Sequence, residues 1–389
     1  MPQLDRSPDL PALRRWLGDR QPRWLEALEE LVSCESPSGD RESIATCARI
    51  VERLFAADAG ATDIRLVEEG AVPYLVLHWD DSGGPSPLLL GHLDTVWDTG
   101  SFQPLFQVSA GRAMGPGVFD MKGGVVVALA ALAGLREANC QRGGMTLLLT
   151  GDEEVGSEAS RDLIEAEARD SSAVLVLEPP LGQAVKIARK GIGGYRLTVR
   201  GRAAHAGLDP ERGVNSLVAI APLVAEVASL ARPELGTTVS PTILRAGTRA
   251  NVIPAHAELE IDVRFALAAE AERVDQGVRK LRVAVPEAAL EVEGGTNRPP
   301  FEPVSSSGLF ALAQVVAREL GWPGLEGATV GGGSDGNFTA ALGVPTLDGL
   351  GIVGGNAHAA GEWVELISIA DRAALLAGLL AKIWAGRLS

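Results

Sequence analysis

The spacing of apolar positions changes along the first half of the chain. Segments 10–32 and 42–57 carry apolar residues every three or four positions, which predicts amphipathic helices. An Ala-rich helical segment follows at 123–136, among short apolar runs that are typical of buried strands. We therefore expect an α/β fold with a mainly parallel sheet flanked by helices. The short apolar runs lie at 74–78, 88–90, 145–150 and 173–177.

The pattern differs between residues 191 and 296. Segments 195–200 and 257–264 alternate apolar and polar residues, as half-buried antiparallel strands do. Two amphipathic helical patterns accompany them at 213–230 and 269–283. This combination predicts a small α+β domain.

The α/β pattern returns after this segment. We therefore expect an α/β catalytic domain formed by residues 1–190 and 297–389, interrupted by an inserted α+β domain at 191–296. The returning pattern predicts a helix at 305–320, a strand at 345–350 and a closing helix at 367–384.

The composition is that of a globular protein with an acidic surface. Of 389 residues, 46 % are hydrophobic and 22 % are charged, while only 4 % are aromatic. Together with 46 glycines, this favours a core of Ala, Val and Leu and many tight turns. The 35 basic residues are outnumbered by 50 acidic ones, which gives a net charge of −15. Such a surface repels nucleic acid on average, so we expect no nucleic-acid partner.

Cysteine usage and the N-terminal segment bear on the compartment. Cys34, Cys47 and Cys140 form no CxxC pair, so neither a disulfide framework nor a Cys-ligated zinc site is indicated. Residues 1–20 mix Asp, Arg and Pro and lack the apolar core of a signal peptide. No run of about 18 apolar residues predicts a membrane span. We therefore expect a cytoplasmic protein with no membrane partner.

His and carboxylate residues follow several of the predicted strands. In an open α/β sheet, ligands bind beyond the carboxyl ends of the strands, where side chains converge from distant sequence positions. Each residue alone has a structural explanation, as a hydrogen-bonding His, a helix-capping Asp or an acidic turn. Their occurrence in one ordered series favours a functional site instead. The series consists of 91–95 (GHLDT), 117–123 (GVFDMKG), 150–154 (TGDEE), 177–179 (LEP) and 356–358 (NAH).

Two His and three carboxylates in this series are enough ligands for two zinc ions. Each ion needs about three protein ligands, so one carboxylate must bridge. Asp120 is central in the order and short enough to hold two ions ~3.5–4 Å apart. We therefore expect two zinc ions per chain, with cobalt or manganese as possible substitutes. The candidate ligands are His92, Asp120, Glu154, Glu178 and His358.

Two further acidic residues have expected roles beside these ligands. Glu153 and Glu154 are adjacent, so their side chains diverge, and Glu153 can accept a proton while Glu154 binds metal. Asp94 lies two residues after His92, on the same face of an extended backbone. We therefore expect its carboxylate to accept a hydrogen bond from the imidazole and to fix the tautomer.

The motifs resemble those of the M20 family of metallopeptidases, and within it the carboxypeptidase G-like group of glutamate carboxypeptidases. GHLDTVW, GPGVFDMKGG, TGDEEVGS and LEPP match that family in type, order and approximate spacing. The later GRAAHAG, RANVIP, DVRF, GGGSDGN and NAH match it as well. The resemblance implies a zinc-peptidase-like catalytic domain with an inserted lid, and a homodimer formed through that lid.

The resemblance also implies roles for individual residues. It implies that the five candidate residues are metal ligands, with Asp120 as the bridge, and that Glu153 is the general base. Asp94 matches the carboxylate that orients the first histidine. His205 matches a residue that reaches the substrate, in dimeric members from the partner subunit. Asn251, Arg264 and Arg298 match positions where the family has polar groups that contact the substrate or support the site.

Arg298 and the glycine-rich stretch 331–337 indicate how a substrate carboxylate is bound. A guanidinium binds a carboxylate through two parallel hydrogen bonds, and Arg298 lies where the inserted domain rejoins the sheet. Gly333 lies in a stretch that is predicted to open a helix, whose N–H groups can hold an anion. A nucleotide site is not indicated, because the sequence has neither a P-loop Lys nor a Gly-x-Gly-x-x-Gly pattern.

The sequence therefore predicts hydrolysis of an amide bond next to a free carboxylate. The reaction would release a C-terminal amino acid, such as glutamate, from a small peptide or an N-acyl conjugate. A deacylase that acts on acetylornithine or succinyl-diaminopimelate is an alternative with the same metal ligands. A non-catalytic binding protein would lack a ligand or the base, and all of these residues are present. A mononuclear enzyme would differ in its metal content per chain.

Overall fold

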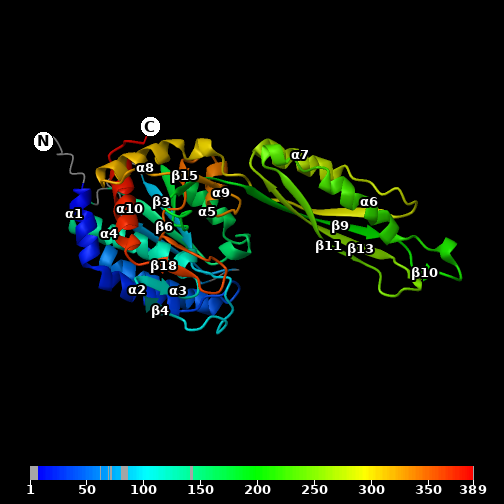
Figure 1. The fold of residues 1–389 in the computed structure, drawn as a ribbon, viewed down its shortest axis with the longest axis horizontal. Helices are drawn as coiled ribbons and strands as arrows, with labels where there is room; N and C mark the ends of the chain where they lie inside the picture. The colour runs from blue at the N-terminus through cyan, green and yellow to red at the C-terminus, as the bar shows by residue number, and fades with distance from the viewer. Residues whose placement is uncertain are drawn as a thin grey trace. The chain divides into compact units, whose positions relative to one another are not determined.

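The structure is a computed structural model of the chain (Figure 1). It describes residues 8–61, 63–68, 70, 72–79, 86–140 and 143–388. The chain forms two compact units. Unit 1 consists of Met1–Ala188, Pro303–Thr329 and Ser334–Ser389, and unit 2 consists of Arg189–Glu302 and Val330–Gly333.

Unit 2 is longer than the inserted segment expected at 191–296. The backbone explains the difference, because the segments that enter and leave unit 2 pair with one another. Arg189 N donates a hydrogen bond to Phe301 O, and Lys190 N donates one to Val330 O. These backbone pairs keep the entering, leaving and returning segments together in unit 2.

A six-stranded sheet forms the centre of unit 1. Four of its strands are parallel neighbours, and β1 and β2 add two antiparallel strands at one edge. The expectation of a mainly parallel sheet therefore holds for four of the six strands, while the whole sheet is mixed. In order across the sheet, the strands are β1 (Asp63–Val67), β2 (Tyr74–Trp79), β6 (Met145–Thr150), β3 (Pro87–His92), β7 (Ala173–Val176) and β16 (Thr346–Leu347).

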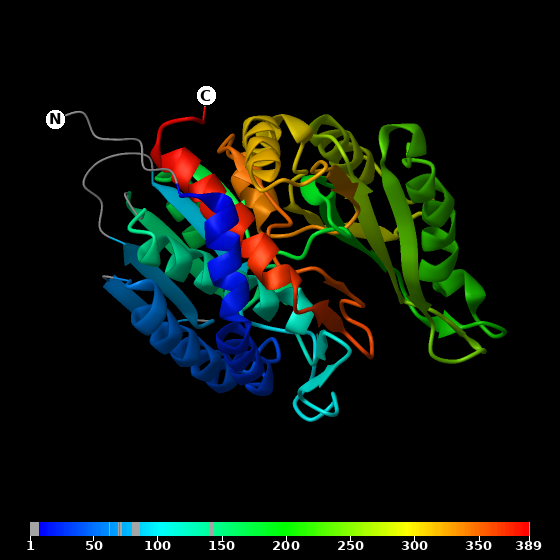
Figure 2. The same ribbon diagram turned by 60° about the vertical axis from the view of Figure 1, so that its left-hand side comes forward.

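Helices cover both faces of this sheet, which confirms the α/β class. Leu89 packs into the larger hydrophobic cluster on one face, whereas Leu88 and Leu90 pack into the smaller cluster on the other. Figure 2 shows α10 lying along α1, on the face of the sheet that carries the larger cluster. The larger cluster contains α1 (Leu10–Asp19), α2 (Gln21–Ser33), α3 (Arg41–Leu54), α4 (Gly123–Glu137), α8 (Ser307–Glu319) and α10 (Ser368–Trp384), and the smaller contains α5 (Arg161–Arg169) and α9 (Gly336–Ala341).

The segment expected to form one helix over 10–32 forms two, α1 and α2. The chain leaves the helical path at Arg20, and α2 then begins with Pro22 in its first turn. Proline lacks a backbone N–H and clashes with the preceding turn inside a helix, but it is well accommodated in a first turn. Pro22 therefore starts a new helix rather than continuing the first.

Helix α4 fills the centre of the larger cluster. Among the described residues, the segment Val118–Glu137 is long and apolar enough to cross a membrane, and it is almost wholly buried inside the protein. A Cβ at Gly124 would lie 2.0 Å from the carbonyl oxygen of Leu177, so only glycine permits this approach. The contact brings the start of α4 against the end of β7.

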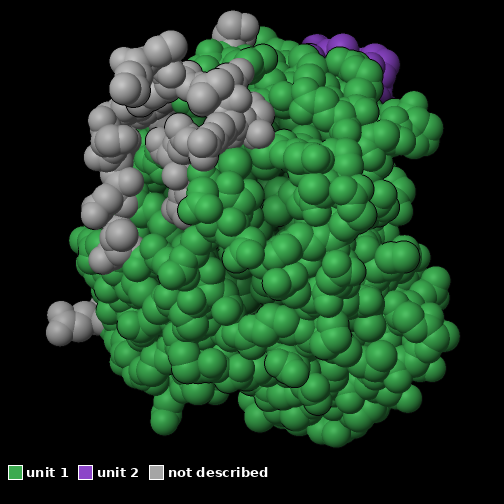
Figure 3. Space-filling view, turned by 90° about the vertical axis from the view of Figure 1, so that its left-hand side faces the viewer, with its two compact units in different colours: residues 1–188, 303–329, 334–389 green, residues 189–302, 330–333 purple. Residues whose placement is uncertain are grey.

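Unit 2, of which a small part is visible in purple in Figure 3, contains a four-stranded antiparallel sheet. Two helices pack on one face of this sheet. On one of the two central strands, Leu197 and Val199 belong to the apolar cluster that includes these helices, and they alternate with the polar residues Arg196 and Thr198, as the pattern predicted. The strand order is β11 (Thr238–Ala246), β13 (His256–Phe265), β9 (Gly191–Arg200) and β14 (Ala289–Arg298), and the helices are α6 (Ser216–Ala228) and α7 (Ala268–Arg279).

Candidate metal centre

Three candidate ligands lie at the carboxyl ends of neighbouring parallel strands. His92 is the last residue of β3, and Glu154 and Glu178 follow β6 and β7. Because these strands are adjacent, their ends meet at one edge of the sheet and the side chains converge there. Asp120 lies in the turn that precedes α4, and His358 lies in the loop before β18 (Trp363–Glu365).

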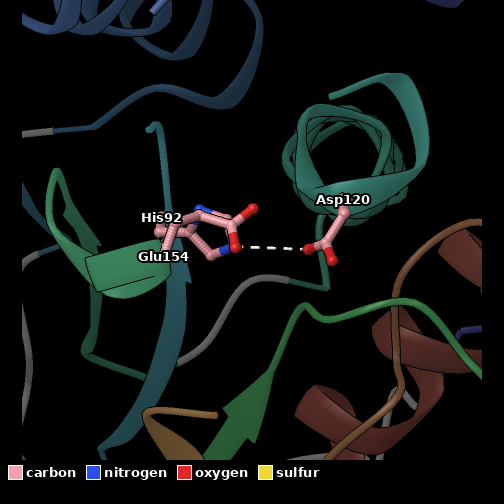
Figure 4. A group of neighbouring side chains, drawn as sticks. All are labelled: His92, Asp120 and Glu154. Carbon is pink, nitrogen blue, oxygen red and sulfur yellow. Dashed lines mark ion pairs between the residues drawn. The ribbon is translucent and has the colours of Figure 1, made fainter. Parts of the chain in front are cut away.

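Two sets of side chains share Asp120. Asp120 Oδ1 lies 3.4 Å from His92 Nε2, which in turn lies 3.5 Å from Glu178 Oε1. Asp120 Oδ2 lies 3.3 Å from His358 Nε2, which lies 3.1 Å from Glu154 Oε2. Figure 4 shows the Asp120 carboxylate facing His92 and Glu154. The structure therefore brings together all five predicted ligands and gives each set one oxygen of Asp120.

The donor atoms of this cluster fit divalent cations. Among the described residues, His92 Nε2 and Glu154 Oε1 are buried atoms without a hydrogen-bond partner. Such atoms cost about 1–3 kcal/mol each when they stay unpaired, and more when charged. Donor atoms of His92, Asp120 and Glu154 lie within 4.8 Å of one another, as do those of His92, Glu153 and Glu178. Imidazole nitrogen and carboxylate oxygen are ligands that zinc takes in enzymes.

The carboxylates of the cluster act on its two histidines. Burial lowers the pKa of His92, but Asp120, Asp94 and Glu178 outweigh it and raise that pKa well above its ordinary value. Contacts with Asp120 and with Glu154 raise the pKa of His358 to about 10. The carboxylates alone therefore favour protonated imidazoles, and a cation that takes their place must release these protons.

Asp94 joins the first histidine to the turn that carries the two glutamates. His92 Nδ1 lies 2.9 Å from the backbone carbonyl oxygen of Asp94 and 3.4 Å from its Oδ1. The Asp94 carboxylate accepts hydrogen bonds from the backbone N–H groups of Glu153 and Glu154, at 3.1 and 3.2 Å, and from Ser38 Oγ at 2.7 Å. The imidazole therefore has the backbone carbonyl as its nearest acceptor, where we had expected the carboxylate.

Glu153 and Glu154 take part in different groups within the cluster. Glu154 contacts His358, whereas Glu153 lies with His92 and Glu178. Both glutamates belong to the single 3-10 turn Glu153–Val155 that follows β6. Adjacent residues on such a turn project in different directions. This geometry places the predicted base beside the predicted ligands.

Glu362 lies against the site and was not identified from the sequence. It is fully buried, and its carboxylate accepts hydrogen bonds from the backbone N–H groups of Phe119 and Asp120. Burial raises the pKa of the Glu362 carboxyl, and these N–H donors act in the opposite direction. The one sequence signal for it is its position four residues after His358.

Three predicted substrate-binding residues gather around Ile192 of β9 in unit 2. Arg264 on β13 and Arg298 on β14 both pair with Ile192, and directly paired residues share a face of the sheet. A Cβ at Gly333 would lie 2.8 Å from Ile192 Cδ1 and 3.0 Å from Arg298 Cδ. The guanidinium of Arg264 contacts the carboxylate of Asp262 at 2.9 Å. Arg298 and Gly333 are thus in contact, while Arg264 is held by a residue of its own strand.

His205 and Asn251 lie side by side in unit 2. His205 pairs with Val252 in a short antiparallel ladder, and the backbone carbonyl of Asn251 accepts a hydrogen bond from the residue after His205. His205 Nδ1 accepts hydrogen bonds from the N–H groups of Gly207 and Leu208, both at 3.1 Å. Because Nδ1 is an acceptor, the proton of the neutral imidazole is assigned to Nε2.

The chain is similar to known hydrolases over most of its length. It is 34 % identical to Carboxypeptidase G2 of Pseudomonas sp. (strain RS-16), over 95 % of this chain and 91 % of that protein. It is 30 % identical to a Succinyl-diaminopimelate desuccinylase of Halorhodospira halophila, over 90 % of this chain and 95 % of that one.

The fold is also found in a solved structure. The M20 family metallo-carboxypeptidase Sso-CP2 from Sulfolobus solfataricus matches with a TM-score of 0.74 at 16 % identity, over 93 % of this chain and 99 % of that one. In addition, the sequence profile of Peptidase family M20/M25/M40 matches residues 88–382, a range that contains all five candidate ligands. The chain therefore belongs to the M20/M25/M40 peptidase family and is a metal-dependent hydrolase of amide bonds.

Proposed function

We propose that this protein hydrolyses an amide bond next to a free carboxylate and releases a C-terminal amino acid, with glutamate as the first candidate. The observation that carries the proposal is the pair of His–carboxylate sets that share Asp120, with Glu153 beside them. The similarity to Carboxypeptidase G2 over 95 % of the chain supports this class of reaction. The substrate would be a small peptide or an N-acyl amino acid.

Two zinc ions are the proposed cofactors, with cobalt or manganese as substitutes. His92, Asp120 and Glu178 would hold one ion, and His358, Asp120 and Glu154 would hold the other. When bound, such ions polarise a carbonyl group and lower the pKa of water.

Glu153 and His205 are the proposed proton-handling residues. The Glu153 carboxylate accepts a proton from the attacking water and returns it to the departing nitrogen, so that the amide C–N bond breaks with a neutral amine as the leaving group. His205 carries its proton on Nε2 and would donate a hydrogen bond to the carbonyl oxygen as negative charge develops there. Asn251, beside His205, would support that contact.

Arg298 is the proposed ligand for the substrate carboxylate. Arg298 lies against Gly333. Arg298 and Arg264 both pair with Ile192, so the two arginines lie on the same face of the sheet in unit 2. Arg298 would bind the substrate carboxylate through two parallel hydrogen bonds, and Arg264, which contacts Asp262, would support the site.

We expect Arg298→Lys to raise the KM for an N-acyl glutamate by about 10–100-fold, because Lys cannot form two parallel charge-assisted hydrogen bonds. The measurement is steady-state kinetics with the N-acyl glutamate and with its α-carboxamide analogue. Arg279→Lys, at an exposed arginine of unit 2 paired with Asp275, is the matched control and should leave KM unchanged. An unchanged KM in Arg298→Lys would rule out the proposed contact.

The reaction itself is tested with metal-reconstituted protein and a panel of substrates, by measuring the released amino acid. The panel contains α- and γ-glutamyl conjugates, other N-acyl amino acids, acetylornithine and succinyl-diaminopimelate. We expect release from the glutamyl conjugates and none from their carboxamide analogues. Hydrolysis of succinyl-diaminopimelate alone would favour the second candidate, a desuccinylase, which the similarity to the Halorhodospira halophila enzyme supports.

A homodimer formed through unit 2 is also proposed. Helix α6 carries an exposed face without charged residues over most of its length, and β11 beside it is an edge strand with two exposed apolar residues. Two copies can pair these surfaces around a two-fold axis. The exposed apolar residues are Leu217, Val218, Ala221, Pro222 and Ala225 on α6, and Ile243 and Leu244 on β11.

We expect Val218→Asp to shift the protein from dimer to monomer in sedimentation velocity, because the change puts a charge into the apolar face of α6. Val304→Asp, at an exposed apolar residue of unit 1, is the control and should leave the dimer intact. A wild-type chain that sediments as a fully active monomer would contradict the dimer.

Mixed dimers show which subunit supplies His205. Chains carrying Glu153→Gln and chains carrying His205→Ala are each expected to be inactive. If His205 acts on the partner's site, half of a random mixture consists of heterodimers with one intact site, and about a quarter of the wild-type activity returns. If it acts within its own chain, the mixture stays inactive.

A further inference from the structure

Glu362 has a set of hydrogen bonds that links it to the metal centre. It is fully buried, and its two carboxylate oxygens accept hydrogen bonds from four N–H groups. The donors to Oε1 are Phe119 N at 2.7 Å and Asp120 N at 3.0 Å, and the donors to Oε2 are Gly117 N at 3.1 Å and Trp97 Nε1 at 2.9 Å.

The position of Glu362 in the chain connects two ligand segments. It lies four residues after His358, and two backbone hydrogen bonds, from Ala359 N to Asn356 O and from Glu362 N to Ala359 O, close the turns between them. The carboxylate then holds the backbone N–H of Asp120. One side chain therefore ties the segment of His358 to the segment that carries the shared carboxylate.

Only a carboxylate matches these four partners. Each oxygen of an ionised carboxylate offers two acceptor positions, and here each oxygen meets two N–H donors. A glutamine in its place would turn its NH₂ group toward two of the donors, which leaves those buried N–H groups unpaired. An aspartate keeps the charge but is one methylene shorter, so it cannot reach all four.

We propose that Glu362 is a positioning residue of the metal centre, which holds the backbone of Asp120 at the separation from His358 that lets one carboxylate serve two cations. The proposal rests on the proposed two-metal function. The Asp120 Oδ2 to His358 Nε2 distance of 3.3 Å is the separation that Glu362 would maintain.

The test is a titration of metal-free full-length protein with Co²⁺ alone, followed by the visible absorption of the bound ion and by the Co²⁺ content. We expect the wild type to bind two Co²⁺ per chain. Glu362→Gln should bind at least one of them about 10–100-fold more weakly, with an altered spectrum, because partners that orient metal ligands have effects of this size. With saturating Co²⁺, kcat should fall while KM for the substrate stays the same.

Glu270→Gln is the matched control for loss of a buried carboxylate. Glu270 is buried in unit 2, where it accepts hydrogen bonds from Thr237 and Arg273. It should lower the melting temperature of the metal-free protein and leave Co²⁺ affinity and spectrum unchanged. If Glu362→Gln behaves in the same way, Glu362 is only structural and the proposal is overturned.

Two further results keep the outcomes distinct. If Glu362→Gln does not fold, Glu362→Asp carries the test, with weaker Co²⁺ binding expected and unchanged binding overturning the proposal. If the wild type itself binds fewer than two Co²⁺ per chain, the proposed two-metal function fails, and this inference falls with it. Two Co²⁺ in the wild type and undiminished binding in both Glu362 variants overturn this inference alone.

Discussion

Glu153→Gln is expected to lower kcat by about 10²–10⁴-fold while the protein keeps its metal content, because general-base catalysis contributes a factor of this size. Glutamine has nearly the same shape as glutamate but cannot take a proton from the attacking water. Glu154, its neighbour, stays available to His358 and to a cation. The measurement is kcat for an N-acyl glutamate together with metal content by elemental analysis.

Glu158→Gln is the matched control for this variant. Glu158 is an exposed residue of the same connection between β6 and α5, so its replacement removes the same charge without touching the cluster. It should keep wild-type kcat. A Glu153→Gln variant with near-normal turnover would refute the assignment of the base, and one that loses its metal would make Glu153 a ligand instead.

Asp120→Ala is expected to lose both cations, because the residue supplies one oxygen to each ligand set. Each set then keeps one histidine and one glutamate, fewer protein ligands than catalytic zinc sites use. The measurement is metal content per chain after dialysis, and hydrolysis should fall to the background rate. Asp162→Ala, at an exposed residue in the first turn of α5, is the control. Full occupancy in Asp120→Ala would rule out the bridge.

The strand ends of the site were predictable because they depend on local patterns. Short apolar runs gave β3, β6 and β7, and the rule that ligands bind at the carboxyl ends of such strands then placed His92, Glu154 and Glu178 at one edge. In the structure, His92 contacts both Asp120 and Glu178, and Glu154 contacts His358.

The features that were missed depend on tertiary contacts. Strands β11 and β14 lie at the edges of their sheet and are mostly exposed. In β14 the apolar alternation covers only residues 289–293 and stops at Gly294 and Gly295, so the segment gives a weaker strand signal than β9 and β13.

Glu362 was missed for a similar reason. Its partners Gly117, Phe119 and Asp120 lie about 240 residues away in the sequence, and such distant pairing leaves no local pattern. Likewise, the Asp94 carbonyl oxygen is the nearest acceptor for His92 because of the path of the backbone after β3.

We propose that amide hydrolysis by this chain depends on two metal ions, held by sets that share Asp120. The most direct test of this dependence is to add Zn²⁺ in steps to metal-free protein and to measure the amino acid released from an N-acyl glutamate. We predict no release without metal and a rate that rises until two equivalents of Zn²⁺ per chain are bound. A rate that is independent of metal, or one that is complete at a single equivalent, would contradict the dependence on two ions.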